Sequence, residues 1–195
     1  MAASGAKILH LRCVEYARRF DIPIHVRSSF SYREGTLIVT QPVADEGENV
    51  GAPIIAGVAH DRSQAKITVV GVPDHPGKAA EIFQACADAE INIDMIVQNV
   101  SAVETGLTDI SFTVPKTDGQ VGVQALKRIQ PAVGFASLLY DDHIGKLSLV
   151  GAGMRSHPGV SATFFKALAT AGINIEMIST SEIRVSVITL SLIHI

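Results

Sequence analysis

The chain has 195 residues, of which 47% are apolar and 18% charged, and its formal net charge is −3 at pH 7. This composition excludes a disordered chain and offers no basic surface for nucleic acid, which is therefore not an expected partner. No apolar run approaches the ~18 residues of a membrane span and no secretory signal opens the chain, so we expect a cytoplasmic protein without membrane contact.

The N-terminal part does not form a domain on its own. Apolar residues recur at helical spacing in 8–20, and 22–26 alternates as a short strand does. The next segment, 35–53, is rich in Gly, Pro and acidic residues and contains one strand-like stretch at 37–39. Two isolated elements cannot bury their apolar faces, so we interpret 1–34 as the end of a larger domain and 35–53 as a linker.

The segment 54–143 has the pattern of one small domain. The periodicity predicts strands and helices in the order strand 54–58, strand 66–70, helix 79–89, strand 91–99, strand 109–114, helix 121–129 and strand 135–140. Helices that alternate with strands around one central hairpin indicate a ferredoxin-like βαββαβ unit of the α+β class, with two helices on one face of an antiparallel sheet.

An internal repeat shows that this unit occurs twice. The hexapeptide at 91–96 returns at 173–178, and the same offset of 82 (174 minus 92) carries Pro76-Gly77 onto Pro158-Gly159. Two copies predict two like domains about a pseudo-twofold axis. In the second copy, 144–195, we expect strands and helices at 146–150, 160–171, 173–179 and 183–189. No room remains for a second helix and last strand, and 190–195 is atypical, so we expect an incomplete sheet with one uncovered face.

The repeated motifs suggest a binding site for a free amino acid. Each Pro-Gly pair precedes a helix, whose N-terminal N–H groups attract a carboxylate. Asn92 and Asp94, or Asn174 and Glu176, lie two positions apart on a predicted strand and point the same way, toward an ammonium group. The simpler interpretation is that these residues only cap helices and end strands, but the duplication of both features favours binding.

Other chemistries find less support. The glycines at 151 and 153 lack the third glycine of a dinucleotide site, and the histidines are scattered, so no metal site and no catalytic residue are expected. Asp141-Asp142-His143 is more typical of a solvated turn than of a metal or acid/base cluster. Cys13 and Cys86 have no metal-ligand spacing, and we expect both to be reduced and buried.

These motifs together closely resemble the tandem ACT domains of actinobacterial and related aspartate kinases. The resemblance covers about 1–188 and is carried by 66–71, 91–101, 139–146, 154–160 and 179–187, while 5–30 is similar to the last helix and strand of the kinase domain. Leu11 departs from the usual Pro, and 190–195 matches nothing in the family.

The resemblance implies a regulatory part that binds L-lysine, L-threonine or both for feedback inhibition. It implies that ATP and Mg belong to a kinase domain outside this chain, and that ACT units pair in a homodimer or with the full-length kinase chain. One implied effector site comprises Asp74, Pro76, Gly77, Ala79, Asn92, Ile93, Asp94 and Gln98, with Asn174 and Ile175 across the interface. The other comprises Met154, His157, Pro158, Gly159, Val160, Glu176, Ser181 and Glu182.

Two other functions remain open at this point. The chain could be a catalytic fragment of the kinase, or it could be an ACT-type regulatory subunit of another amino-acid biosynthetic enzyme. Phosphorylation of aspartate by this chain alone would support the first, whereas the match over 1–34 argues against the second.

Overall fold

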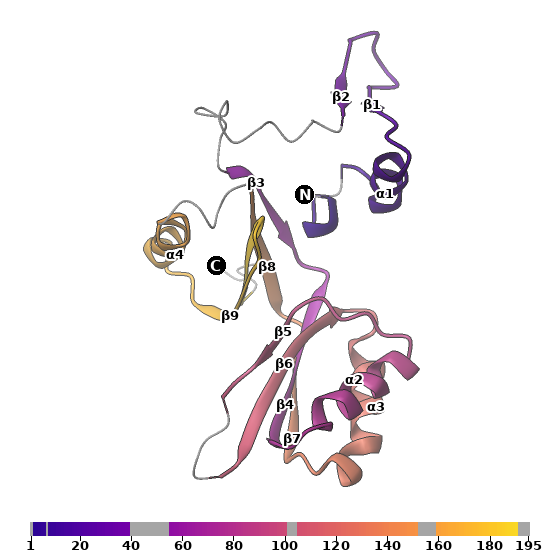
Figure 1. Cartoon of the computed structure of the whole chain (residues 1–195). Helices are drawn as coiled ribbons and strands as arrows, with labels where there is room; N and C mark the ends of the chain where they lie inside the picture. Colours follow the sequence, from indigo (N-terminus) through magenta and orange to yellow (C-terminus); the bar gives the residue numbers. More distant parts are fainter. Residues whose placement is uncertain (1, 7, 40–54, 101–104, 152–158, 191–195) are drawn as a thin grey trace.

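Two four-stranded antiparallel sheets form the centre of the molecule, and a smaller two-stranded unit lies beside them (Figure 1). The structure is a computed structural model, and the residues that it describes are 2–6, 8–39, 55–100, 105–151 and 159–190.

The first sheet and two helices build the first copy of the repeat. In chain order its elements are β4 (Gln64–Pro73), α2 (Lys78–Asp88), β5 (Ile96–Gln98), β6 (Leu107–Pro115), α3 (Gly119–Val133) and β7 (Ser137–Asp141). The strands lie in the order β5-β6-β4-β7, and both helices cover the same face (Figure 1). Alternate residues of the two central strands, such as Ile67 and Phe112, are fully buried against these helices. The predicted ferredoxin-like unit is therefore confirmed.

The second copy has a four-stranded sheet in the order β3-β8-β10-β9. Its elements are β3 (Ile55–Asp61), β8 (Ile144–Gly151), α4 (Val160–Thr170), β9 (Ile175–Thr180) and β10 (Arg184–Leu190). Phe164 and Leu168 of α4 pack on Leu149, Val185 and Val187 of the central strands. In the part of the chain that the structure describes, α4 is the only helix on this sheet.

The prediction that 54–58 is a strand of the first copy is wrong. This strand, β3, pairs antiparallel with β8, and Asp61 lies opposite Lys146. In the first copy β7 pairs with β4 in the same way, with Asp141 opposite Lys66. Strand β3 therefore takes the place of the fourth strand of the second copy, and the first copy is inserted between β3 and β8. The expected gap in the second sheet is filled from the N-terminal side.

The N-terminal elements make few contacts with the two sheets. A short 3-10 helix, η1 (Ala2–Ser4), touches β3, whereas α1 (Leu11–Arg19) buries none of its residues. Strands β1 (Ile24–Val26) and β2 (Thr36–Ile38) pair as a hairpin, so the first described part of the predicted linker is a strand. The rest of that linker, 40–53, lies outside the described residues. The prediction that both cysteines are buried is correct for Cys86 and wrong for Cys13, which is exposed.

Strand β5 is much shorter than the predicted strand 91–99. The segment before it stays beside β6 through backbone bonds from Asp94 N–H to Thr113 O and from Thr113 N–H to Met95 O. The Thr113 hydroxyl accepts the Met95 N–H at 3.1 Å, which replaces a ladder bond. The alternation of apolar residues from Ile91 to Ile96 predicts a regular strand over this segment. In the structure the Thr113 side chain interrupts the backbone hydrogen-bond ladder, so the regular strand begins only at Ile96.

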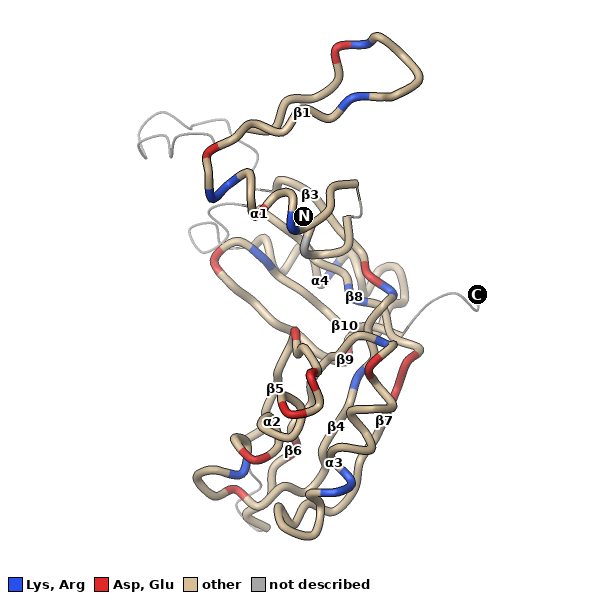
Figure 2. The backbone as a smooth tube through the Cα atoms, turned by 90° about the vertical axis from the view of Figure 1, so that its right-hand side faces the viewer, with Lys and Arg blue, Asp and Glu red and all other residues tan. Residues whose placement is uncertain are grey.

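Charged residues of both signs are scattered over the chain. Figure 2 shows Lys and Arg in short stretches among Asp and Glu, with no long basic run. None of the described helices is long and apolar enough to cross a membrane.

Candidate functional site

A pocket of about 330 Å³ opens at the start of α2, between the β4–α2 turn and the strands β5 and β6. It is lined by five residues of the predicted first site, Asp74, Pro76, Gly77, Ala79 and Gln98. The structure adds residues that the resemblance did not include, among them His75, Lys78, Thr108 and Ile110. The turn and the edge strand, far apart in the sequence, thus meet around one hollow.

The pocket contains an uncapped helix N-terminus. Gly77 precedes α2 with φ of 97°, a left-handed conformation that favours glycine, and no side chain caps the helix. A β-carbon on Gly77 would meet nothing within 4 Å, so the space above the helix start is open. The Lys78 N–H donates to His75 O at 3.3 Å, and the other first-turn N–H groups and the helix dipole give this end of the pocket a partial positive charge.

Polar groups of both signs surround this helix start. The Asp74 carboxylate is exposed, and the turn that carries it is held by a 2.9 Å bond from Asp74 N–H to Gly106 O. The Lys78 ammonium lies near the end of α3, where it donates to Ala132 O and to the Glu81 carboxylate. Gln98 offers an amide from β5. A carboxylate, an ammonium and a polar side chain of one small ligand would each find a partner here.

Three predicted members of the first site do not line this pocket. Ile93 packs against the core of the first copy, and Asn92 is exposed. The Asp94 carboxylate instead forms an ion pair with Lys146 of the second copy. The prediction that the Asn92 and Asp94 side chains point the same way assumed a continuous strand, but the regular strand begins only at Ile96.

The second predicted site is described only in part, because Met154, His157 and Pro158 lie outside the described residues. Gly159 repeats the Gly77 geometry, with φ of 102°, no side-chain cap and open space at its α-carbon, and Val160 begins α4. Ser181 and Glu182 lie in the β9–β10 turn, where the Ser181 N–H donates to Arg184 O at 2.7 Å. Asn174 is exposed, and Ile175 packs on the second core.

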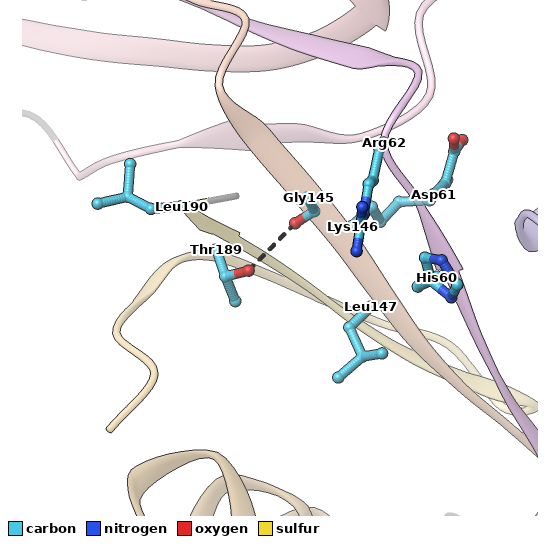
Figure 3. A pocket seen from close by; sticks show the side chains of 8 residues that line it. All are labelled: His60, Asp61, Arg62, Gly145, Lys146, Leu147, Thr189 and Leu190. Atoms are coloured by element: carbon cyan, nitrogen blue, oxygen red, sulfur yellow. Dashed lines mark hydrogen bonds between the residues drawn. The ribbon is translucent and has the colours of Figure 1, made fainter. Parts of the chain in front are cut away.

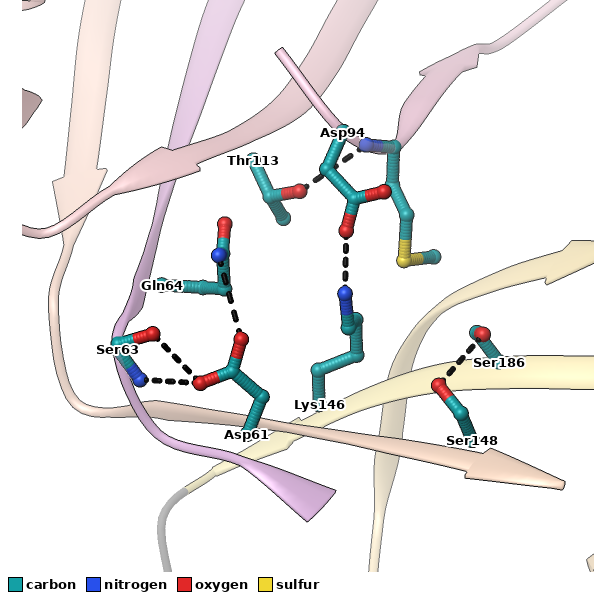
Figure 4. A network of polar contacts seen from close by, with 9 residues as sticks. Asp61, Ser63, Gln64, Asp94, Thr113, Lys146, Ser148 and Ser186 are labelled. Atoms are coloured by element: carbon teal, nitrogen blue, oxygen red, sulfur yellow. Dashed lines mark hydrogen bonds and ion pairs between the residues drawn. The ribbon is translucent and has the colours of Figure 1, made fainter. Parts of the chain in front are cut away.

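The two repeated acids meet lysines at the boundary between the copies. Lys146 pairs with Asp94, and Lys66 pairs with Glu176 (Figure 4 shows the first pair). Sequence reasoning missed both lysines as site residues, although their spacing of 80 (146 minus 66) nearly repeats the 82 of the acids (176 minus 94). The acids that were expected to bind an ammonium do so, but the ammonium belongs to the protein.

A third carboxylate lies beside this network. Burial raises the pKa of Asp61, but hydrogen bonds from the Ser63 hydroxyl, the Ser63 N–H and the Gln64 amide, together with the Lys146 charge, hold it below its ordinary 3.8 (Figure 4). Asp61 is therefore ionised at neutral pH and fixes the bend from β3 into β4.

A second pocket of about 280 Å³ lies on the second copy between the ends of β3, β8 and β10. Its lining residues are His60, Asp61, Arg62, Gly145, Lys146, Leu147, Thr189 and Leu190 (Figure 3). In the first copy the residue equivalent to His60 is Tyr140, whose ring lies against Gly119 at the start of α3. This pocket is thus the place that α3 fills in the first copy.

The cluster Asp141, Asp142 and His143 forms the bend between β7 and β8. Its ligand atoms lie within 4.8 Å of one another, with His143 Nδ1 2.9 Å from Asp142 Oδ1. The His143 side chain is 76% exposed, and the backbone N–H of His143 donates to Asp141 Oδ1 at 2.8 Å. These residues connect β7 to β8, as the predicted turn requires, and their ligand atoms are close enough to hold a metal ion.

Comparison with protein families identifies both copies. Residues 67–129 and 147–190 match the family model described as "ACT domain". The chain is 60% identical over 192 residues to the aspartokinase of Mycobacterium tuberculosis, a match that covers 96% of this chain and 44% of that protein. The chain thus spans less than half the length of the curated relatives it matches.

Solved structures agree with this match. A crystal structure of aspartokinase alpha and beta subunits is 51% identical, with a TM-score of 0.65 over 70% of this chain and 88% of that one. The ligand-free regulatory subunit of aspartate kinase from Thermus thermophilus is 41% identical, with a TM-score of 0.67 over 71% of this chain and 90% of that one.

Proposed function

We propose that this chain, which belongs to the ACT-domain family and to the regulatory region of the aspartokinases, binds a free amino acid and so controls an aspartate kinase. The observation that carries the proposal is the pocket at the start of α2, where an uncapped helix N-terminus, Asp74 and Gln98 lie around one hollow.

Each part of an amino acid has a partner of matching chemistry in this pocket. The ligand carboxylate lies on the N–H groups that follow Gly77, and its ammonium faces Asp74. Gln98 and the buried Thr108 surround the ligand side chain. Hydrogen bonds that involve a charged group contribute about 1.5–3 kcal/mol each, so the carboxylate and the ammonium group of the ligand supply most of the affinity.

L-threonine and L-lysine are the ligands that we propose first. An amide beside a helix start suits the hydroxyl of threonine, and a second site that includes Ser181 and Glu182 suits a longer cationic side chain. We further propose that Asn174 and Ile175 of a partner ACT unit complete the first site, in a homodimer or in an assembly with a full-length aspartate kinase chain.

The rest of the kinase is also part of the proposal. Residues 1–34 are the end of a kinase domain whose remainder, with its ATP and Mg sites, lies outside this chain, and 35–53 connects it to the two ACT units. In this arrangement the two ACT units regulate, and phosphorylation belongs to the kinase domain. Its working place is the cytoplasm, where amino-acid biosynthesis supplies the ligand.

Calorimetric titration tests the first site. L-threonine, L-lysine, L-methionine and L-isoleucine are titrated into the chain and into Asp74→Asn and Gln98→Ala. We expect threonine or lysine to bind and either substitution to weaken binding about 10-fold or more, because Asp74→Asn removes the charge that faces the ligand ammonium and Gln98→Ala removes the amide beside the ligand side chain. Asp88→Asn, an exposed acid on α2, is the matched control and should bind as the unchanged chain does. Equal affinity in all four proteins would reject the pocket.

A further inference from the structure

The two ion pairs between the copies are reciprocal. Lys66 on β4 of the first copy holds Glu176 on β9 of the second, and Lys146 on β8 of the second copy holds Asp94 of the first. The two lysines occupy equivalent positions in the two sheets. Lys66 on β4 lies opposite Asp141 of β7, and Lys146 on β8 lies opposite Asp61 of β3. One interaction is therefore made twice, in opposite directions, about the pseudo-twofold axis.

The pairs are partly shielded from water. The side chain of Lys146 is 2% exposed, and those of Lys66 and Glu176 are 19% and 20% exposed. The residues that follow the two acids in the sequence, Met95 and Met177, form an apolar cluster with Ile144 and Ile188, and the two methionines are again equivalent residues of the repeat. Salt screens such pairs less than surface pairs, and their geometry is fixed by the packing around them.

Each pair ends on the segment that carries a proposed ligand site. Asp94 lies two residues before β5, which places Gln98 in the pocket at α2. Glu176 is the second residue of β9, which leads into the turn with Ser181 and Glu182. The central strand of each copy thus holds the edge strand of the other, and the two edge strands contact each other.

We propose that these four residues form an inter-copy clamp that couples the ligand pocket of the first copy to β9 and the β9–β10 turn of the second. The coupling rests on the proposed function, but the clamp itself does not. When a ligand fixes β5, Asp94 and Lys146 transmit the position of β5 to β8, and Lys66 with Glu176 transmits that of β4 to β9. Two partly buried pairs of this kind permit one relative orientation of the copies and disfavour intermediate ones.

Substitution of both lysines by methionine tests the clamp. Lys66→Met and Lys146→Met, singly and together, remove the charged amino group and keep an unbranched apolar side chain that is one atom shorter. The carboxylates that remain are 20% and 33% exposed and can be hydrated, so the fold is expected to survive. Lys127→Met, at an exposed position on α3, is the matched control.

The first measurement needs no ligand. We expect the unchanged chain and Lys127→Met to unfold in one denaturant transition, and the double variant to unfold in two, because its copies lose their mutual support. A double variant that still unfolds in one transition would contradict the clamp. If the double variant fails to fold, the same comparison is made on each single variant.

The second measurement compares amide hydrogen exchange of each protein before and after addition of an amino acid. L-threonine is tested first and L-lysine second. In the unchanged chain, we expect a probe that slows exchange in β5 to slow exchange in 175–180 as well. In the double variant, we expect the slowing in 175–180 to fall about fivefold or more, while β5 stays protected. Equal protection of 175–180 in both proteins would overturn the coupling. If neither probe protects β5 in any protein, the proposed function fails, and the clamp is decided by the unfolding transitions alone.

Discussion

At the scale of single residues, the partner of a side chain decides its role more than its type does. Asp94 and Glu176 are repeated acids next to repeated asparagines, which is a reasonable signature for binding an ammonium group. In the structure that ammonium comes from Lys146 and Lys66. Asp74, which is not repeated at the equivalent place, is the acid that lines the pocket.

A prediction about pH follows from Asp61. Its folded pKa lies below the ordinary 3.8, so its ionised form stabilises the fold above about pH 4, and this contribution is lost as the pH falls through the folded pKa. Asp61→Asn keeps an acceptor for Ser63 and removes the charge near Lys146. We expect the variant to be less stable than the unchanged chain at pH 7 and the difference to shrink below pH 4, as measured by urea unfolding. A difference independent of pH would show that the Asp61 charge does not contribute.

At the scale of elements, β3 decides how the chain is organised. It leads into β4 through only Arg62 and Ser63, yet it belongs to the sheet of the other copy (Figure 1). Its register on β8 matches that of β7 on β4, so the second sheet has the same order as the first. An N-terminal strand thus completes a domain whose other elements begin more than 80 residues later.

A substitution in β3 should therefore act on the second copy. Ala59 is 4% exposed and lies opposite Ser148 of β8. Ala59→Asp would place an unpaired carboxylate there, and we expect a loss of at least about 2 kcal/mol in the free energy of unfolding. Hydrogen exchange should accelerate in 144–151 and much less in 107–115. The reverse pattern would mean that β3 supports the first sheet. Val58→Asp, at a 56% exposed neighbouring position, is the control with little expected effect.

At the scale of the whole molecule, the two copies share a third core. Copy-specific clusters lie under the helices, while Met95, Met177, Ile144 and Ile188 are buried between the sheets. The seam therefore combines an apolar cluster with two ion pairs between the copies. Such a construction gives a pair of small domains one preferred orientation, which a regulatory unit requires if binding in one part is to be felt in another.

The apolar centre can be tested separately from the ion pairs. Met177 is 5% exposed, and Met177→Ala would leave a cavity between the sheets that costs about 2–5 kcal/mol of unfolding free energy. Because both copies line the cavity, we expect exchange to increase in 96–98 as well as in 175–180. Ile183→Ala, at a residue 61% exposed in the β9–β10 turn, is the control. An increase confined to the second copy would argue against a shared core.

The sequence by itself determined the type and approximate extent of nearly every described helix and strand, because buried faces impose periods of about 3.6 and 2 on apolar residues. It also showed that one unit occurs twice, and the resemblance to the ACT domains of aspartate kinases predicted a site with a Pro-Gly helix start, Asp74 and Gln98, which line one pocket in the structure. Only the tertiary structure decided that β3 joins the second sheet, since edge-strand pairing depends on which edge is free and leaves no local pattern. Only the tertiary structure also decided the partners of Asp94 and Glu176. These acids pair with lysines that lie 52 and 110 residues away in the sequence, and the periodicity within a strand carries no information about contacts at such separations.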